Sequence, residues 1–460
     1  CATDRDSQFF CSADPDQGGA AQRYLLAAGI RWQRTNETFE QLLFGGYREL
    51  RIRENFTGRL LDARGDGLDE QYAAGTAGAR GSYRVRLPLF GHDQHLELGW
   101  IARHDSGETR AWRRRLELGT PYARLFDATI HLTRVGAHLL GELRPADALS
   151  IRAGLRFDAF HFGVIDHGLP ESDRMGPRLP DEASSASGLA VQPRGSVQVS
   201  LQPWLDWVTS GGLGTRSSDA IALSEGERAP FAQVVATETG LIASASEARR
   251  FTLRAQGGAF HTYVDRDLIF DATRGRNVPV GSSNRFGAFL FARVQIEDWL
   301  DAAASVAWTE ANLGGDYFAL GTGPRVPFVP RATGRVDLAI RKEVVIGGEP
   351  FRFGGAIGTS VLGPRPLPNG QEGEASALVD ASLSAAWRFV ELGVMAQNLF
   401  DVRYERASYA YVSDFGTTSA PSMTADRHLA AGAPLTLFVT LTLHLEPLRW
   451  LTGEARTSEP

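Results

Sequence analysis

The sequence of 460 residues contains no apolar run near the roughly 18 residues that a membrane-spanning helix needs, which excludes a helical membrane protein. It has only two cysteines, Cys1 and Cys11, and they do not have the CxxC-like spacing of a zinc site. The net charge of −6 gives no sign of nucleic-acid binding. The low mean hydropathy does not exclude a membrane protein, because only alternate residues of a membrane-spanning strand face lipid.

Catalytic patterns are also missing from the sequence. The ten histidines are scattered, and no two have the spacing of a helical zinc motif. No nucleophile elbow or phosphate-binding loop is present. A site assembled from residues on separate strands would not be visible in one sequence, so an enzyme is kept as the least favoured alternative. We expect no enzyme activity, no cofactor and no metal ligands.

What the sequence does contain is long period-two alternation, most clearly in residues 434–446. Aliphatic residues occupy every second position, with Phe438 the single apolar residue on the other face. A soluble sheet can also have one apolar face. Soluble strands, however, mostly run about 5–6 residues, whereas a tilted membrane-crossing strand needs roughly 9–11. The aliphatic face consists of Leu435, Leu437, Val439, Leu441, Leu443 and Leu445.

The same alternation recurs in 149–159 and 285–297, where the face opposite the aliphatic one includes arginine and glutamate. These charges would be costly against a dry core but suit a wet lumen opposite a lipid-facing band. The sequence therefore predicts an all-β, transmembrane antiparallel β-barrel. We expect its strands near 22–33, 40–54, 74–87, 92–104, 129–143, 148–162, 188–201, 204–214, 234–245, 249–262, 284–296, 300–311, 329–344, 350–362, 375–387, 390–400 and 434–446.

The expected connections alternate in length. Short turns, such as 145–147 and 345–349, alternate with long loops, such as 163–187 and 401–433. Short periplasmic turns and long outer loops are typical of outer-membrane barrels. The 17 expected strands are odd in number, so the first and last run in the same direction and cannot pair antiparallel. We therefore expect an odd number of strands to be missing, or a miscount by one.

Several segments resemble the TonB-dependent outer-membrane receptors. The segment 396–404 carries Asn398, Leu399, Phe400, Asp401 and Tyr404, and is similar to the family's "v-x-N-L-F-D-x-x-Y" near the penultimate strand. Leu435 stands where the family's "G-x-P-R" entry to the last strand has arginine. Further similar segments are Asn55-Phe56-Thr57 with Gly65-Asp66 and Gln71, Gly212–Ala220, Glu238-Thr239-Gly240, Asn284–Gly287 and Gly432-Ala433-Pro434.

The resemblance implies a 22-stranded barrel around an N-terminal plug. Residues 1–446 would then be the C-terminal portion of that barrel, without the plug, and 447–460 a C-terminal tail. It also implies an integral protein of the bacterial outer membrane that imports a scarce ligand, a ferric siderophore or another metal chelate foremost. The implied partners are a TonB-type energy-transducing complex, acting through the plug, and outer-membrane lipid and lipopolysaccharide. A passive porin is the alternative, since 18 strands would need only one more. An outer-membrane barrel enzyme is the least favoured of the three functional classes.

Two groups of loop residues are candidates for ligand contacts. Trp112, Arg113 and Arg114 are expected in a long outer loop at 105–128, where they would contact anionic lipopolysaccharide or, less simply, capture an anionic ligand. Tyr409, Tyr411 and Phe415 lie past a strand end in the loop 401–433. Aromatic residues at this level normally form an interfacial girdle, but these could also line a ligand mouth.

The two cysteines, Cys1 and Cys11, lie near the start of the sequence. In an oxidising compartment we expect them to form a disulfide that closes a small loop; two free thiols in a mobile end are the alternative. A cysteine at residue 1 would also fit a lipoprotein N-terminus. We favour a fragment boundary, because no signal peptide precedes it and the alternation starts in mid-pattern.

Overall fold

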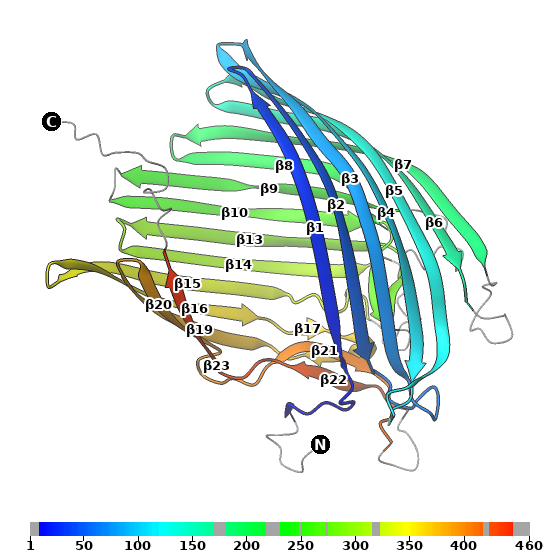
Figure 1. The fold of residues 1–460 in the computed structure, drawn as a ribbon. Coiled ribbons are helices and arrows are strands. Elements are labelled where there is room, and N and C mark those ends of the chain that lie inside the picture. Colours follow the sequence, from blue (N-terminus) through cyan, green and yellow to red (C-terminus); the bar gives the residue numbers. More distant parts are fainter. Residues whose placement is uncertain are drawn as a thin grey trace, which may run out of the picture.

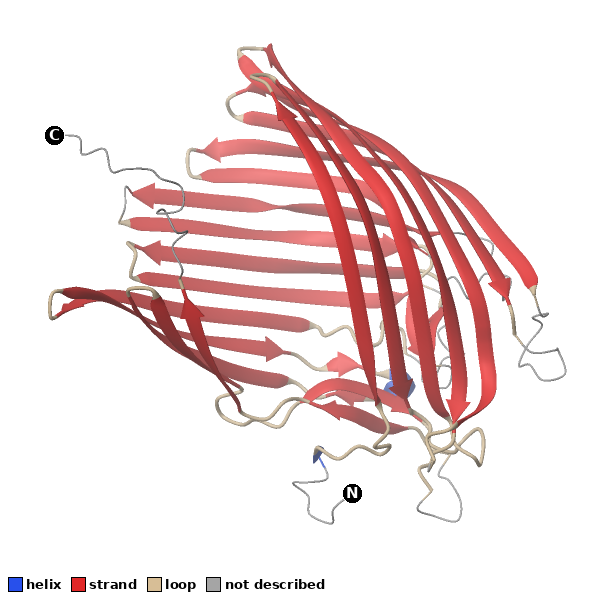
Figure 2. Cartoon of the chain, in the orientation of Figure 1, coloured by secondary structure: helices blue, strands red, loops and turns tan. Residues whose placement is uncertain are grey.

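The computed structural model describes residues 9–116, 118–168, 181–217, 231–247, 250–271, 275–314, 323–416 and 423–444. These ranges are almost entirely strand, and most strands belong to one large, strongly curved antiparallel sheet (Figures 1 and 2). No helix in these ranges is long and apolar enough to cross a membrane.

The sheet has 17 strands, each paired with the next along the chain, and all 17 expected strands are confirmed. In order they are β1 (Gly18–Gln33), β2 (Glu37–Glu54), β3 (Gly67–Leu89), β4 (His92–Arg114), β5 (Pro121–Ala146), β6 (Leu149–Asp166), β7 (Glu182–Gln202), β8 (Leu205–Ser217), β9 (Phe231–Glu247), β10 (Phe251–Val264), β13 (Ser283–Ile296), β14 (Leu300–Leu313), β15 (Ala332–Ile346), β16 (Glu349–Leu362), β19 (Ser376–Trp387), β20 (Val390–Gln397) and β23 (Thr436–Leu443).

The strands β3 to β7 are longer than the sequence pattern predicted. The expected outer loop at 105–128 is wrong, because β4 runs on to Arg114 and β5 begins at Pro121. Trp112, Arg113 and Arg114 therefore lie on a strand. The reason is that the ladder between β4 and β5 continues beyond the alternating segment, and the pairing persists across register shifts after Ala111 and Arg113.

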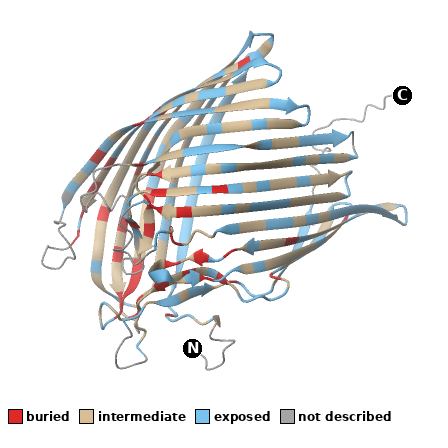
Figure 3. Cartoon of the chain, turned by 180° about the vertical axis from the view of Figure 1, so that it is seen from behind, coloured by how far each residue is buried: buried red, intermediate tan, exposed pale blue. Residues whose placement is uncertain are grey.

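Three two-stranded sheets lie among the long connections at one end of the large sheet; β17, β21 and β22 are labelled in Figure 1, towards the lower right. They are formed by β11 (Leu268–Asp271) with β12 (Arg276–Pro279), β17 (Arg365–Pro366) with β18 (Glu372–Gly373), and β21 (Glu405–Tyr411) with β22 (Asp426–Ala431). A 3-10 turn, η3 (Pro368–Gly370), lies between β17 and β18. Buried residues gather towards this loop end, many of them in the parts of the strands nearest the loops, and few lie near the short turns (Figure 3).

The two faces of the sheet differ as the alternation predicts. On one face, aliphatic side chains such as Leu290 and Val306, which lie opposite each other on β13 and β14, are about half exposed (54% and 51%). On the other face, charged residues pair across strands. Asp158 of β6, fully buried, accepts hydrogen bonds from Arg134 Nε (2.9 Å) and Arg156 Nε (2.5 Å). A polar lumen and an apolar outer face follow from this division.

Both edges of the sheet are open within the described residues. β1 pairs only with β2, and β23 pairs only with β20. Both strands run from the loop end to the end with the short turns (Figure 1), so they point the same way. An antiparallel closure of this sheet needs an odd number of further strands.

Candidate functional site

The connection from β2 to β3 is an ordered loop held from within by one carboxylate. Asp66, 3% exposed, accepts a hydrogen bond from Thr57 Oγ1 (2.9 Å) and from the backbone N–H groups of Leu61 (2.8 Å) and Asp62 (2.9 Å). Arg113 Nη1 of β4 lies 3.4 Å from Asp66 Oδ1. The Asn-Phe-Thr and Gly-Asp motifs of the sequence thus serve to fold this loop.

A second carboxylate ties the segment before β1 to the same loop. Asn55 donates its side-chain N–H to Asp14 Oδ2 (3.0 Å), while its own carbonyl oxygen Oδ1 accepts the N–H of Gly58 (2.9 Å). Arg114, 1% exposed, places Nη2 3.6 Å from Asp14 and Nη1 3.6 Å from Asp16. Burial and two carboxylates hold Arg114 inside the protein, away from an outer ligand.

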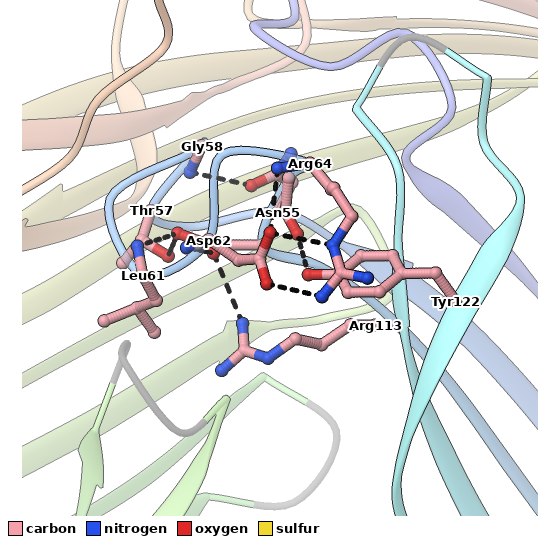
Figure 4. Close-up of polar contacts among 10 residues, drawn as sticks. Asn55, Thr57, Gly58, Leu61, Asp62, Arg64, Arg113 and Tyr122 are labelled. Atoms are coloured by element: carbon pink, nitrogen blue, oxygen red, sulfur yellow. Dashed lines mark hydrogen bonds and ion pairs between the residues drawn. The ribbon is translucent and has the colours of Figure 1, made fainter.

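The outward side of the loop carries an ion pair next to an aromatic ring. Arg64 donates twice to Asp62 (3.1 and 2.9 Å) and lies over the ring of Tyr122, 4.1 Å from its centroid (Figure 4). The hydrogen bonds from Arg64 lower the pKa of Asp62 to about 2. Tyr122 in turn donates to the carbonyl of Gly65 (2.6 Å), so β5 is also attached to the loop.

The β2–β3 loop also contacts the hairpin β21–β22. This hairpin lies in the connection between β20 and β23, the last two strands of the large sheet. Arg59 N–H donates to the carbonyl of Asp414 (2.6 Å), and Asp414 N–H donates to the carbonyl of Thr57 (2.9 Å). Gly58, between them, has φ +73°, and a Cβ there would lie 2.0 Å from the Asp414 carbonyl oxygen. Only glycine allows this close approach.

Aromatic rings from these distant loops form one cluster. Its members come from the β2–β3 loop, β11, the connection before β15, and the hairpin β21–β22; they are Phe56, Phe270, Phe328, Tyr409, Tyr411 and His428. Neighbouring ring centroids lie 5.1 Å apart for Phe56 and Phe270, and 5.4 Å apart for Phe270 and Tyr409. Such contacts are in the favourable range for aromatic pairs. We call this set the aromatic cluster.

Burial sets the ionisation of the cluster's polar members. It raises the pKa of the phenols of Tyr409 and Tyr411, with a further contribution from nearby Glu54, so both stay neutral. Burial also lowers the pKa of His428, whose ring stacks on Tyr411 at 3.9 Å. His428 Nδ1–H donates to the Asp426 carbonyl (2.9 Å), which leaves Nε2 to accept the hydroxyl of Ser413 (2.8 Å).

A buried ion-pair network supports the hairpin from β17. Arg365, 6% exposed, donates to Ser408 Oγ (2.6 Å) and to the Glu405 carbonyl (3.3 Å). Ser408 also donates to the carboxylate of Glu405, which Arg427 approaches to 3.4 Å. These contacts fix the strand that carries Tyr409 and Tyr411, so the positions of the two phenols are set by the fold.

The structure brings together only some of the predicted ligand residues. Tyr409 and Tyr411 join the aromatic cluster, whereas Phe415 has no ring contact with it among the described residues. Arg113 and Arg114 are held by Asp66 and Asp14, as described above. Four members of the cluster were not singled out as ligand residues. Phe56 lay within a recognised motif, but Phe270, Phe328 and His428 lie in connections whose sequences carry no spacing signal.

The predicted family motif at the end of β20 has a structural role in its turn. Asn398, with φ +51°, donates to the carbonyls of Val402 (2.8 Å) and Ala433 (3.1 Å). Asp401 accepts the backbone N–H of Leu435 (2.8 Å). Leu399 N–H donates to the Val379 carbonyl, Phe400 is 70% exposed, and Tyr404 lies against Gly432, where a Cβ would lie 2.2 Å from its ring.

Some predictions fall outside the described residues. Cys1 is one of these residues, so the disulfide with Cys11 stays a prediction. The same holds for the tail 447–460. Among the described residues there is no group of three or more His, Cys, Asp or Glu side chains that could hold a metal ion.

Long strands with a wet face, an apolar face and an ordered cap of outer loops define a large transmembrane β-barrel. The family model for "TonB dependent receptor-like, beta-barrel" matches residues 3–399, so the chain belongs to this family. It is therefore an integral protein of the bacterial outer membrane. No curated protein sequence matches the chain.

Solved structures resemble the fold along nearly the whole chain. The ferric yersiniabactin uptake receptor FyuA from Yersinia pestis has a TM-score of 0.72 at 14% identity, covering 94% of this chain and 63% of that one. The copper transporter OprC has a TM-score of 0.68 at 15% identity, covering 94% of this chain and 66% of that one. The siderophore receptor PiuA from Acinetobacter baumannii has a TM-score of 0.67 at 13% identity, covering 93% of this chain and 65% of that one. The chain thus spans less than two thirds of each receptor's length.

Proposed function

We propose that the whole protein, of which this chain supplies barrel strands and outer loops, imports a bulky metal chelate, with a ferric siderophore as the first candidate. The observation that carries the proposal is the aromatic cluster. Loops from separate parts of the sheet bring six rings together at the outer mouth, and a buried ion-pair network holds the hairpin beneath Tyr409 and Tyr411. The family to which the chain belongs supports the same reading.

The chemistry of the cluster favours the organic part of a chelate as the group recognised. Neutral phenols and phenyl rings offer faces for stacking on planar or apolar ligand groups. The hydroxyls of Tyr409 and Tyr411 add hydrogen-bond donors that stay protonated because burial raises their pKa. We include Phe415 as a candidate at the rim. Arg113 and Arg114 serve the loop instead, because carboxylates hold both.

Transport would need parts that this chain does not supply. We propose a plug that fills the lumen and a TonB-type complex that drives it, since barrels of 16–18 strands already leave an aqueous channel and larger ones need a plug. The structural neighbours include receptors named for ferric siderophores and one named as a copper transporter, so the metal of the chelate is a variable of the test.

Uptake by cells expressing the full-length gene tests this proposal. We expect saturable accumulation of a radiolabelled ferric siderophore, drawn from a panel that also holds copper chelates, and its loss in a strain without the energy transducer. Truncating an aromatic contact at the centre of a binding site costs about 2 kcal/mol or more, so Tyr409→Ala should raise the half-saturation concentration at least about tenfold. Tyr24→Ala, at a 64% exposed ring on β1, is the matched control.

The passive porin is the competing outcome. Uptake that rises linearly with concentration, and that persists without the transducer, would support it and contradict our proposal. An unchanged half-saturation concentration for Tyr409→Ala, with transport intact, would remove the aromatic cluster as the binding site while leaving import itself in place.

A further inference from the structure

A carboxylate on the lumen face lies beside the aromatic cluster. Glu54 is the last residue of β2 and comes two residues before Phe56 of the cluster. It shares a face with Leu42, twelve residues earlier, because alternate residues of a strand point the same way. Cross-strand partners also share a face, and such pairs lead from the lumen-facing Asp158 through Gly136, Ile101 and Arg80 to Leu42. The side chain of Glu54 is therefore on the lumen side, at the loop end of its strand.

The carboxylate of Glu54 is half-buried and has no counter-charge. Arg51 and Arg53 precede it on β2 but point to the opposite face, where they lie 2.6 and 3.5 Å from the carboxylate of Asp69. No hydrogen bond or ion pair to the Glu54 carboxylate is present in the part of the chain that the structure describes. Because burial disfavours a charge without a partner, it raises the pKa of Glu54.

The aromatic cluster also has no cation of its own. Under the hairpin β21–β22, Arg365 and Arg427 approach the carboxylate of Glu405 to 3.9 and 3.4 Å, so both are already paired. Among the described residues, no guanidinium lies over a ring of the cluster. Aromatic faces and a carboxylate both attract positive charge. The site therefore offers two kinds of cation-binding group, and the fold supplies no cation to fill it.

The β2–β3 loop contains the complete form of this arrangement. Arg64 lies 4.1 Å from the ring centroid of Tyr122 while it donates to Asp62 at 3.1 and 2.9 Å (Figure 4). A cation is held there between an aromatic face and a carboxylate. In the aromatic cluster the rings and the carboxylate of Glu54 are present, and the cation is the missing part.

Two hydroxyl groups belong to the same site. The charge of Glu54 contributes to the raised pKa of both Tyr409 and Tyr411, so its carboxylate is near both phenols. Neither hydroxyl has a hydrogen-bond partner among the described residues. Each can donate to an oxygen of a ligand or accept an N–H from it. The hydroxyls thus add hydrogen-bonding groups for whatever the carboxylate holds.

We propose that Glu54 makes the aromatic cluster selective for metal chelates that carry a cationic nitrogen group, such as a protonated primary amine. The ammonium group donates hydrogen bonds to the Glu54 carboxylate and lies against the ring face of Tyr409 or Tyr411. The remaining rings contact the organic body of the chelate. This inference rests on the proposed import of a chelate and adds which chelates the site prefers: those with a positive group over otherwise identical neutral ones.

Binding of a matched pair of probes to the purified full-length protein tests this selectivity. One probe is a linear ferric trihydroxamate with a terminal ammonium group, and the other is the same chelate with that amine N-acetylated. Quenching of protein fluorescence should show that the ammonium form binds at least about tenfold more tightly. Glu54→Gln keeps the size of the side chain and removes its charge, so the two affinities should become nearly equal. Glu343→Gln, at an exposed carboxylate near the short turn after β15, should keep the preference.

A metal-free pair of probes separates this inference from the proposed import. A naphthalene fluorophore with an alkylammonium chain should bind more tightly than its N-acetylated form, and Glu54→Gln should again remove the preference. If this pair shows the preference while neither ferric chelate binds, the proposed ligand class is wrong and the cation site stands.

Three results would overturn the cation site. They are equal affinities within a pair that binds, a preference that persists in Glu54→Gln, and the absence of binding by all four probes. Heat-resistant migration on gels establishes that each variant is folded.

Discussion

At the outer mouth, several side chains hold the loops in place, and the arginines that they engage are no longer candidates for ligand binding. Asp66 and Asp14 pair with Arg113 and Arg114, two of the three loop residues that the sequence offered as candidates for contacting an anionic ligand. Gly58 permits the contact with Asp414 because it has no Cβ. The candidates left for a ligand are neutral aromatic residues, which is why the proposed ligand is organic and bulky.

The first prediction concerns His428. Burial lowers its pKa in the folded protein, so between that value and the ordinary value of about 6.5 the unfolded hairpin binds more protons than the folded one. The stability of the hairpin β21–β22 should therefore fall as the pH is lowered through this window. Hydrogen exchange of the hairpin amides, corrected for intrinsic rates, at pH 7.5 and 5.0 measures the loss.

A matched variant isolates the imidazole. His428→Phe keeps a ring against Tyr411 but does not titrate, so its protection should no longer depend on pH in this range. If the variant loses protection as much as the unaltered protein does, another group must be responsible.

At the scale of elements, the ladder determines where strands end. β4 extends to Arg114 because its residues find partners on β3 and β5, although the apolar alternation has already stopped. The extra length, residues 105–114, lifts the loops of this side of the barrel away from the membrane. Strand length beyond the membrane is thus a product of pairing and not of hydropathy.

The second prediction tests the two faces on one central strand. Val306 of β14 faces outward and is 51% exposed, while its neighbour Ala307 faces the lumen opposite Phe289. Val306→Arg should lower the free energy of unfolding in lipid by about 2–4 kcal/mol, the usual cost of arginine on the lipid face near mid-bilayer. Ala307→Arg should cost much less, because its guanidinium reaches water. Urea titration of the full-length protein in lipid vesicles measures both; a larger loss for Ala307→Arg would invert the assignment.

At the scale of the whole molecule, contacts between loops compensate for the open sheet. β1 and β23 have no common ladder among the described residues, yet the β2–β3 loop and the hairpin near β23 are joined by two backbone hydrogen bonds and by ring contacts. Loop contacts therefore hold the outer end in a closed arrangement where the strands leave a gap.

The third prediction is the orientation in the membrane. Leu118, 70% exposed between β4 and β5, should face the outside, and Ala148, in the turn between β5 and β6, should face the periplasm. With a membrane-impermeant maleimide on intact cells, Leu118→Cys should be labelled and Ala148→Cys only after the outer membrane is permeabilised. The protein without an added cysteine corrects for Cys1 and Cys11. Labelling of Ala148→Cys alone on intact cells would reverse the topology.

The sequence by itself determined the barrel, all 17 strands and the odd parity, because side chains alternate with period two and lipid selects one face over at least nine or so residues. It also placed Tyr409 and Tyr411 past a strand end. Only the tertiary structure decided that Arg114 is buried and that Phe56, Phe270 and Phe328 meet these tyrosines. Alternation is a local property, whereas contacts between loops join residues hundreds of positions apart, and they depend on how the sheet curves.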